Sequence, residues 1–542
     1  MRHASLLGMP ESQTQAAGEA SPLDRWLLRW TDWVALLVVV AGCLLRLRAA
    51  TGTFLNPDEA LHFSVANQSS LAAAYHASLT LAHPPLLVLL LYFWRAVGTS
   101  EFVLRLPSVI AGTIFCWIFF RWLKATLGSA VGVTGVIFMA LLPPLVALTA
   151  EVRQYSLLLL FAALATSLLE RALSKNSAAL MALASTSTCL AVFSNYSGLL
   201  FAVALGLYSG LRFLIRQYPA RMIAAWAAGQ ATEIVLIAFL YHVQISGLKN
   251  SFLAEWANTE WLRRSYFHPE HDNLAAFVLG RSFAVFQFVF GQQIVGDIAA
   301  LMFLAGVIFL LQRKFQQPGS EQRLFGIFLL LPFAINCGLA VARRYPYGGT
   351  RHSVFLAMFG IAGISVFLVQ ISRRIPAVAV ALAAFVVVAC YAFGFHHQPY
   401  MTREDQSSFQ MDHAVEFIRS QIPAADPIFT DYEASLMLGY HLCRHPAPGE
   451  ITDPGFHEFS CAGHKIIATS GRVWMFTEET FPESWDELVA RYRLKPNSRV
   501  WVVHMGWGSS VIPRLQIARD DLRLEGSQLF GRNISVFAMT VH

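Results

Sequence analysis

The chain is poor in charged residues. Only 14% of its 542 residues are Asp, Glu, Lys or Arg, whereas 55% are hydrophobic. Ordinary soluble domains carry about 25% charged residues, so a wholly soluble protein is excluded. The net charge of +6 does not indicate a nucleic-acid partner. The basic residues stand mostly in short loops between apolar segments, where they set membrane topology.

Three further signals are missing. No Cys-x-x-Cys occurs among the 7 cysteines, so zinc-ribbon and thioredoxin-like sites have no support. The start of the chain lacks a short apolar core followed by a cleavage site, and residues 1–24 are therefore predicted to be a flexible cytoplasmic tail, not a signal peptide. No internal repeat is apparent.

Apolar stretches of membrane-spanning length dominate residues 25–398, which we predict to be a polytopic membrane domain. About eleven transmembrane helices are expected, near residues 33–49, 102–123, 127–148, 153–173, 178–194, 196–214, 221–243, 294–312, 324–342, 352–371 and 375–395. With the N-terminus in the cytoplasm, Lys and Arg then gather in the cytoplasmic loops, as the positive-inside rule requires. This agreement requires the apolar segment 82–98 to lie against the outer interface as a helix that does not cross. Residues 50–101, 244–293 and 343–351 become external loops.

Residues 399–542 have an ordinary soluble composition and are expected to form an extracytoplasmic α/β domain. Its roughly 140 residues are enough for a core of its own. Hydrophobic patterning predicts helices at 409–420 and 432–442 and strands at 427–430, 499–503 and 534–538. No nucleophile elbow, phosphate loop or metal-ligand spacing occurs in it, so a supporting or acceptor-binding role is expected. An oxidising compartment would favour a disulfide between Cys443 and Cys461.

An acidic pair, Asp58-Glu59, follows the first predicted span directly. Carboxylates at a membrane surface suit chemistry on a lipid-linked substrate, because the lipid fixes the depth of the reacting group. Two structural roles stay open, since Asp is a favoured helix N-cap and acidic residues are favoured in a first helical turn. His62 would share a helix face with Asp58, so joint metal ligation also stays open.

Six ordered segments within residues 40–395 resemble bacterial GT-C glycosyltransferases. These enzymes are relatives of protein O-mannosyltransferases and of the aminoarabinose transferases that modify lipid A. The segments are Leu44–Leu47, Asp58–Ala60, His83–Leu86, Ser100–Ser108, Glu151–Tyr155 and Tyr347–Ser353. The resemblance implies a GT-C-like, α-helical polytopic fold. It also implies an inner-membrane enzyme that uses a polyprenyl-phosphate sugar and whose active site faces outward.

The resemblance and the chemistry together assign candidate roles. Asp58 is expected to take the proton of an acceptor hydroxyl, with Glu59 as its catalytic partner. Cationic or hydrogen-bonding groups at the outer ends of spans are expected to bind the donor phosphate; the candidates are His83, Arg153, Arg344, Tyr347 and Arg351. Glu151 is expected to support Arg153 or to meet the acceptor. No cofactor is required for such a transfer, and participation of a divalent metal is left open.

The predicted function is inverting transfer of a sugar from a polyprenyl-phosphate donor to a lipid, glycan or protein hydroxyl. A transporter or flippase of lipid-linked sugars would show polar or broken helices near mid-membrane. The predicted spans carry few polar residues near mid-membrane, and the main exceptions are Gln292, Gln293 and Asp297. An O-antigen polymerase or ligase would not be expected to carry an acidic pair after its first span. A sensor or scaffold is a further alternative.

Overall fold

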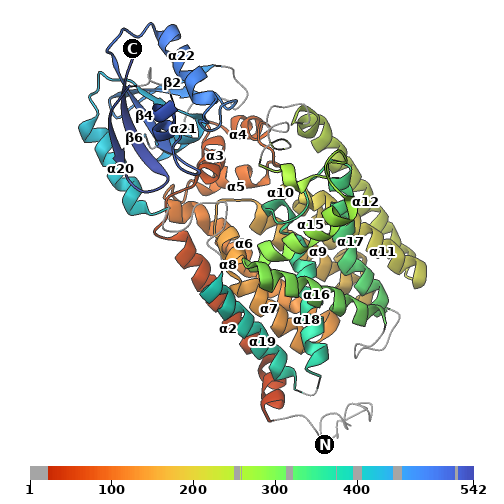
Figure 1. Ribbon diagram of the computed structural model, residues 1–542. Helices are drawn as coiled ribbons and strands as arrows, with labels where there is room; N and C mark the ends of the chain where they lie inside the picture. Colours follow the sequence, from red (N-terminus) through yellow and green to blue (C-terminus); the bar gives the residue numbers. More distant parts are fainter. Residues whose placement is uncertain are drawn as a thin grey trace, which may run out of the picture.

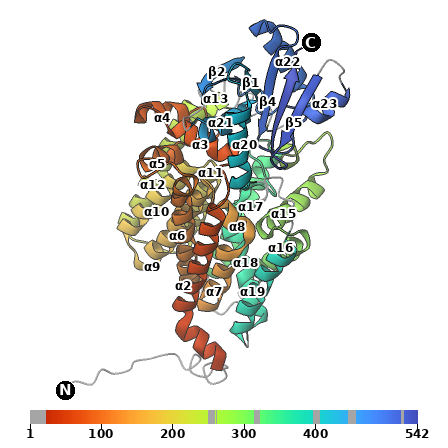
Figure 2. The ribbon, with the colours of Figure 1, turned by 90° about the vertical axis from the view of Figure 1, so that its left-hand side faces the viewer.

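A computed structural model describes residues 22–248, 257, 259, 261–312, 321–373, 375–394, 406–443, 455–518 and 523–541. A long helical bundle carries a smaller α/β domain at one end, and α2 extends toward the other end (Figures 1 and 2). The predicted tail over residues 1–24 falls almost wholly outside these ranges.

Among the described residues, 8 helices are long and apolar enough to cross a membrane. They lie in α2 (Pro22–Ala50), α6 (Glu101–Leu127), α9 (Tyr155–Lys175), α11 (Ser197–Ile215), α12 (Ala220–Leu240) with its continuation through η1 (Tyr241–Ile245) and α13 (Ser246–Leu248), α16 (Gln293–Leu311), α17 (Glu321–Val341) and α19 (Pro376–Phe393). The other three predicted spans coincide with shorter apolar helices, α7 (Ser129–Leu141), α10 (Ala178–Ser194) and α18 (Leu356–Ile371). Each predicted span is therefore helical, although the span predicted at 127–148 divides into α7 and α8 (Pro143–Leu148).

Two of the segments that were predicted to be external loops contain helices of their own. In the first, α3 (Pro57–Ala66), α4 (Leu71–Ser78) and α5 (Leu86–Trp94) follow one another. At 9 residues, α5 is about 14 Å long and does not cross an apolar core of about 30 Å. In the second, α15 (Leu274–Phe290) packs against α16, although residues 244–293 were expected to form a loop. That expectation was wrong: Arg281 and Gln287 interrupt an apolar run of 17 residues, which is as long as the predicted span at 178–194.

The C-terminal domain contains a six-stranded mixed sheet in the order β2-β3-β1-β4-β6-β5. The strands are β1 (Ile428–Thr430), β2 (Phe456–Cys461), β3 (His464–Thr469), β4 (Arg499–Met505), β5 (Arg523–Leu529) and β6 (Ile534–Thr540), with β1 parallel to β3 and β4. Helices α20 (Ser408–Gln421) and α21 (Tyr432–His441) cover one face, and α22 (Thr480–Tyr492) and α23 (Ile512–Ala518) cover the other. Successive strand residues face opposite sides, so Ile428 joins the first core and Phe429 the second.

The domain is docked on the bundle through α21. This helix packs on α3, and residues of both belong to a single apolar cluster. The Tyr440 hydroxyl donates to the carbonyl of Thr99 at 2.8 Å, and the Phe54 amide donates to the carbonyl of Gln406 at 3.0 Å. The predicted disulfide between Cys443 and Cys461 is present. The α/β domain therefore lies directly beside the acidic pair.

Candidate active site

The first turn of α3 presents Asp58. Asn56 caps the helix, because its side chain accepts from the Glu59 amide at 3.0 Å while Glu59 Oε2 accepts from the Asn56 amide at 3.0 Å. Pro57 occupies the first helical position, where its missing N–H costs nothing. The capping role considered for Asp58 thus belongs to Asn56, and the Asp58 carboxylate is available for other contacts.

Two arginines from distant parts of the chain meet on Asp58. Arg153 lies in the turn between α8 (Pro143–Leu148) and α9, and Arg351 opens the short 3-10 helix η3 (Arg351–Ser353). The Nη1 atoms of both lie 2.9 Å from Asp58 Oδ2. Burial alone would raise the pKa of Asp58, but the charges of Arg153 and Arg351 outweigh it and hold this pKa well below its usual range. The carboxylate is therefore ionised and paired.

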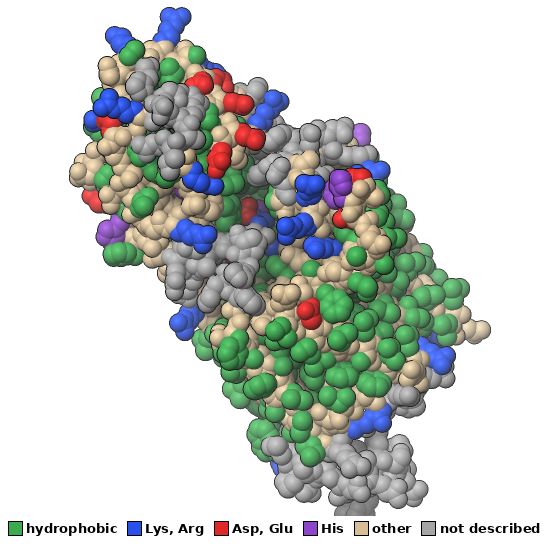
Figure 3. Space-filling model, in the orientation of Figure 1, with side chains coloured by type: hydrophobic (Ala, Val, Ile, Leu, Met, Phe, Trp, Pro, Cys, Tyr) green, Lys and Arg blue, Asp and Glu red, His purple; other side chains and the backbone are tan. Residues whose placement is uncertain are grey.

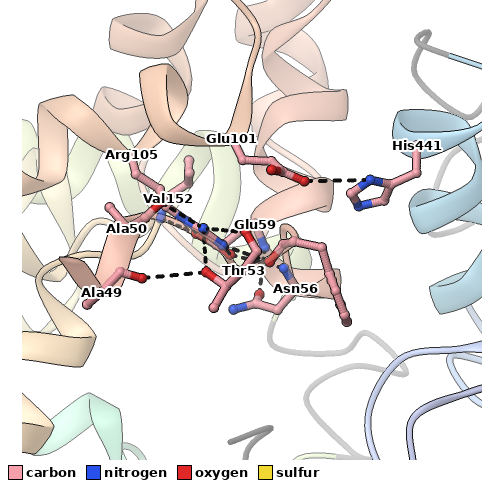
Figure 4. A network of polar contacts seen from close by, with 10 residues as sticks. Ala49, Ala50, Thr53, Asn56, Glu59, Glu101, Arg105, Val152 and His441 are labelled. Atoms are coloured by element: carbon pink, nitrogen blue, oxygen red, sulfur yellow. Dashed lines mark hydrogen bonds and ion pairs between the residues drawn. The ribbon is translucent and has the colours of Figure 1, made fainter. Parts of the chain in front are cut away.

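Glu59 faces the interior of the protein (Figure 4). Its oxygens accept from Arg105 Nε at 2.8 Å, Arg105 Nη2 at 2.6 Å and the Val152 amide at 2.8 Å. Arg105 in turn donates to the carbonyls of Thr53 at 2.9 Å and Phe54 at 2.8 Å. Because these donors and the Asn56 amide occupy its carboxylate, Glu59 is placed to position α3 and the Val152 turn, not to contact a substrate.

Three histidine rings lie beside the Asp58 cluster. His83 stacks between His62, at 5.9 Å between centroids, and His352, at 6.4 Å. Burial first and the nearby arginine charge second lower the pKa of all three rings, so they are neutral near pH 7. His62 Nδ1 contacts the Asp58 carbonyl at 2.7 Å, and its buried Nε2 has no partner among the described residues. The stack thus offers uncharged polar edges next to the charged cluster.

The loop that carries His83 is held by Gln244. This buried side chain donates to the carbonyls of Leu81 at 2.8 Å and His83 at 2.9 Å, and its oxygen accepts from the Tyr196 hydroxyl at 2.7 Å. Gln244 belongs to η1, a π-helical turn at the end of α12. Such turns often occur at functional sites, and here the turn directs the Gln244 amide at the loop that carries His83.

Glu151 opens the turn that contains Arg153. Burial and the neighbouring charge of Glu59 raise its pKa, and the charges of Arg351 and Arg153 offset part of this. Its Oε2 is buried and has no hydrogen-bond partner among the described residues. Glu151 is therefore a carboxyl group beside the cluster with an oxygen available to a ligand.

Arg344 and Tyr347, the other residues predicted to bind the donor phosphate, make no described contact with Asp58. Arg344 is exposed. Tyr347 is buried, and its hydroxyl lies 2.8 Å from Ser282 Oγ on α15. The turn after it requires Gly348, whose φ is +124° and whose added Cβ would lie 3.2 Å from Arg281 Cδ. Tyr347 thus anchors the turn that leads to Arg351.

Among the described residues, no group of three or more His, Cys, Asp or Glu side chains could hold a metal ion. Glu59 is occupied by Arg105, and His62 turns Nδ1 to a backbone carbonyl. The joint ligation considered for Asp58 and His62 would require Asp58 to give up its arginines.

Sequence reasoning missed Arg105 and Gln244. Arg105 stands in the first turn of the predicted span 102–123, so the available signal was a charged residue inside an apolar helix. Gln244 follows an apolar run and looks like an ordinary polar residue beyond it. The stacking of His62, His83 and His352 was also missed, since nothing in the sequence brings these rings together.

The fold and this carboxylate–arginine cluster can now be compared with known proteins. Residues 82–243 match the family model described as dolichyl-phosphate-mannose-protein mannosyltransferase. The matched segment contains His83, Glu151 and Arg153 but neither Asp58 nor Arg351. The resemblance to GT-C glycosyltransferases is thereby confirmed.

Among solved structures, the fold is similar to that of ArnT from Cupriavidus metallidurans in the apo state. The TM-score is 0.54 and the sequence identity 12%, over 93% of this chain and 97% of that chain. AglB from Archaeoglobus fulgidus, in complex with an inhibitory peptide and a dolichol-phosphate, is less similar. Its TM-score is 0.47 and its identity 13%, over 88% of this chain and 69% of that chain. No curated protein sequence matches the chain. The GT-C-like helical membrane fold with a C-terminal α/β domain is thus confirmed.

Proposed function

We propose that this protein is an inverting glycosyltransferase of the inner membrane. It moves a sugar from a polyprenyl-phosphate donor to a hydroxyl of a lipid, glycan or protein acceptor on the outer face. The observation that carries the proposal is the Asp58 carboxylate held between Arg153 and Arg351 at 2.9 Å from each. A general base and a phosphate-binding pair therefore meet at one point, at the end of the bundle where the α/β domain is docked.

Asp58 neutralises one of the two arginine charges when no donor is present. Guanidinium groups bind phosphate oxygens in a bidentate way, so a donor phosphate would compete with Asp58 for both arginines. Once the phosphate takes that place, Asp58 loses the interactions that depress its pKa and becomes a stronger base. Donor binding would thus activate the base, so that proton transfer is coupled to the presence of the sugar.

The transfer itself is a single displacement. The acceptor oxygen forms a bond to the anomeric carbon as the bond from that carbon to the phosphate oxygen breaks. The acceptor proton passes to Asp58, and the polyprenyl phosphate leaves with the electron pair and stays between the arginines. Stabilisation of this developing charge is worth roughly 3–4 kcal/mol for each well-placed group. Attack from the face opposite the leaving group inverts the anomeric centre.

Glu151 and the neutral histidines supply the polar groups around this centre. Glu151 Oε2 and His62 Nε2 are both buried without a partner in the described part of the chain. We assign them to hydroxyl groups of the donor sugar or of the acceptor. His83 is assigned to the donor phosphate side, and Arg344, being exposed, to lipid headgroups at the rim. The two arginines supply the positive charge that a metal would otherwise bring, so no metal requirement is proposed.

The proposal is tested with the purified full-length protein and a polyprenyl phosphate carrying a radiolabelled sugar, in the presence of membrane extract as acceptor and of EDTA. We expect label to move to an acceptor, with an anomeric configuration opposite to that of the donor, and EDTA to leave the rate unchanged. Movement of intact donor across a vesicle without release of polyprenyl phosphate would instead identify a flippase. Retention of configuration would exclude the single displacement.

Arg351→Lys is expected to weaken donor binding about tenfold or more. The lysine keeps the charge but loses the planar fork that matches two phosphate oxygens. Donor KM should therefore rise more than kcat falls. Arg343→Lys is the matched control, since Arg343 pairs with the exposed Glu270 at 2.7 Å and lies outside the cluster. Equal donor KM values for Arg351→Lys and the native protein would assign Arg351 to lipid anchoring.

A further inference from the structure

A polar cavity opens at the end of the bundle opposite Asp58. Its volume is about 330 Å³, and it is lined by the ends of α6, α9 and α11 and the start of α17. Lys124 Nζ lies 2.8 Å from Asp32 Oδ1, which places the end of α6 beside the start of α2. Since α6 has 27 residues and rises about 1.5 Å per residue, this end lies some tens of ångströms from Glu59.

The cavity is positively charged. Among the described side chains that line it, three are basic, Arg171, Arg212 and Arg216, and one is acidic, Glu170. The Glu170 carboxylate has two partners: it accepts from the Tyr208 hydroxyl at 2.6 Å and lies 3.5 Å from Arg212 Nη1. Arg171 and Arg216 are exposed at the rim. The lining therefore carries an excess of positive charge, which selects an anionic occupant.

A buried donor points to the same chemistry. Trp122 lines the cavity and is 1% exposed, and its Nε1 has no hydrogen-bond partner among the described residues. Leaving a buried donor unsatisfied costs roughly 1–3 kcal/mol, and a ligand oxygen that reached the indole N–H from the cavity would remove this cost. Indole N–H and guanidinium groups are all donors without acceptor capacity. Together they fit a ligand with several acceptor oxygens.

The position of the cavity identifies the source of that ligand. Hydrophobic side chains cover the visible face of the bundle, with basic side chains beyond them toward its lower end (Figure 3). The cavity is thus at the depth of lipid headgroups, between the ends of apolar helices. Basic pockets between transmembrane helices bind anionic headgroups. We propose that this cavity binds the phosphate group of an anionic membrane phospholipid, at a site separate from the Asp58 cluster.

The test uses the full-length protein, delipidated in a non-ionic detergent and heated with phosphatidylglycerol, phosphatidylcholine or inorganic phosphate. A ligand that binds only the folded state raises Tm with concentration. We expect phosphatidylglycerol to raise Tm and the other two to have little effect. The double variant Arg171→Gln/Arg216→Gln should weaken the apparent affinity for phosphatidylglycerol about tenfold or more. Trp122→Phe, which removes the indole N–H, should weaken it less.

Arg121→Gln is the matched control. Arg121 lies at the same end, 3.7 Å from Asp32 Oδ1, and does not line the cavity. An undiminished response in Arg121→Gln, with loss in the double variant, supports the site. An equal loss in Arg121→Gln, or an undiminished response in the double variant, would attribute lipid binding to overall surface charge. A Tm shift by inorganic phosphate equal to that by phosphatidylglycerol would overturn the assignment to a lipid.

Discussion

Asp58→Asn is expected to lower kcat about 10²–10⁴-fold while donor affinity stays equal or rises. The amide keeps the shape of the side chain but cannot accept the acceptor proton. It also removes the negative charge from between Arg153 and Arg351, so a donor phosphate no longer competes with it. A parallel loss of kcat and of donor binding would mean that Asp58 only holds the two arginines in place. Near-native turnover would show that Asp58 is not the base.

The matched control is Asp32→Asn, which removes a half-exposed carboxylate from the opposite end of the bundle and should leave kcat unchanged.

The pH dependence of kcat and of kcat/KM gives an independent readout of the role of Asp58. In the free enzyme the arginines hold the pKa of Asp58 below its usual range, so kcat/KM should show no loss from Asp58 between pH 5 and 8. In the donor complex that pKa rises, so kcat should fall with acidification at a higher pH than kcat/KM does.

Much of this site followed from the sequence because membrane topology restricts where a charge can lie. Once Lys and Arg are assigned to one side, Arg153 and Arg351 must emerge on the side of Asp58, and the structure brings both to one oxygen. The long helices followed for a similar reason, since an apolar run of spanning length has few alternatives.

The contacts of individual side chains depend on packing, which a single sequence does not contain. Tyr347 was predicted to bind phosphate, and the structure places its hydroxyl 2.8 Å from Ser282 Oγ on α15. Glu59 was predicted to be a second catalytic carboxylate, and the structure pairs it with Arg105 from the start of a different helix. In both cases the side-chain direction is set by an element that periodicity could not place beside it.

Glu59→Gln is expected to destabilise the protein strongly. Glu59 and Arg105 form an ion pair at 2.6 Å whose side chains are 0% and 3% exposed. Removing one partner of such a pair leaves an uncompensated buried charge, at a cost of roughly 3–5 kcal/mol. Arg105→Met should cost a similar amount. The double variant should cost less than the sum, because neither charge then remains unpaired. Thermal unfolding in detergent would measure this coupling.

The matched control is Glu458→Gln, which breaks an exposed ion pair with Lys465 at 2.8 Å and should cost at most about 1 kcal/mol of stability.

Donor binding separates a role of Glu59 in folding from a role in positioning the site. Glu59 holds the Val152 amide next to Arg153, so the folded fraction of Glu59→Gln should bind donor more weakly, and the double variant should regain stability but not donor affinity. If donor affinity returned together with stability, the pair would serve folding alone. If Glu59→Gln were no less stable than Glu458→Gln, the buried pair would not be what fixes α3 against α6.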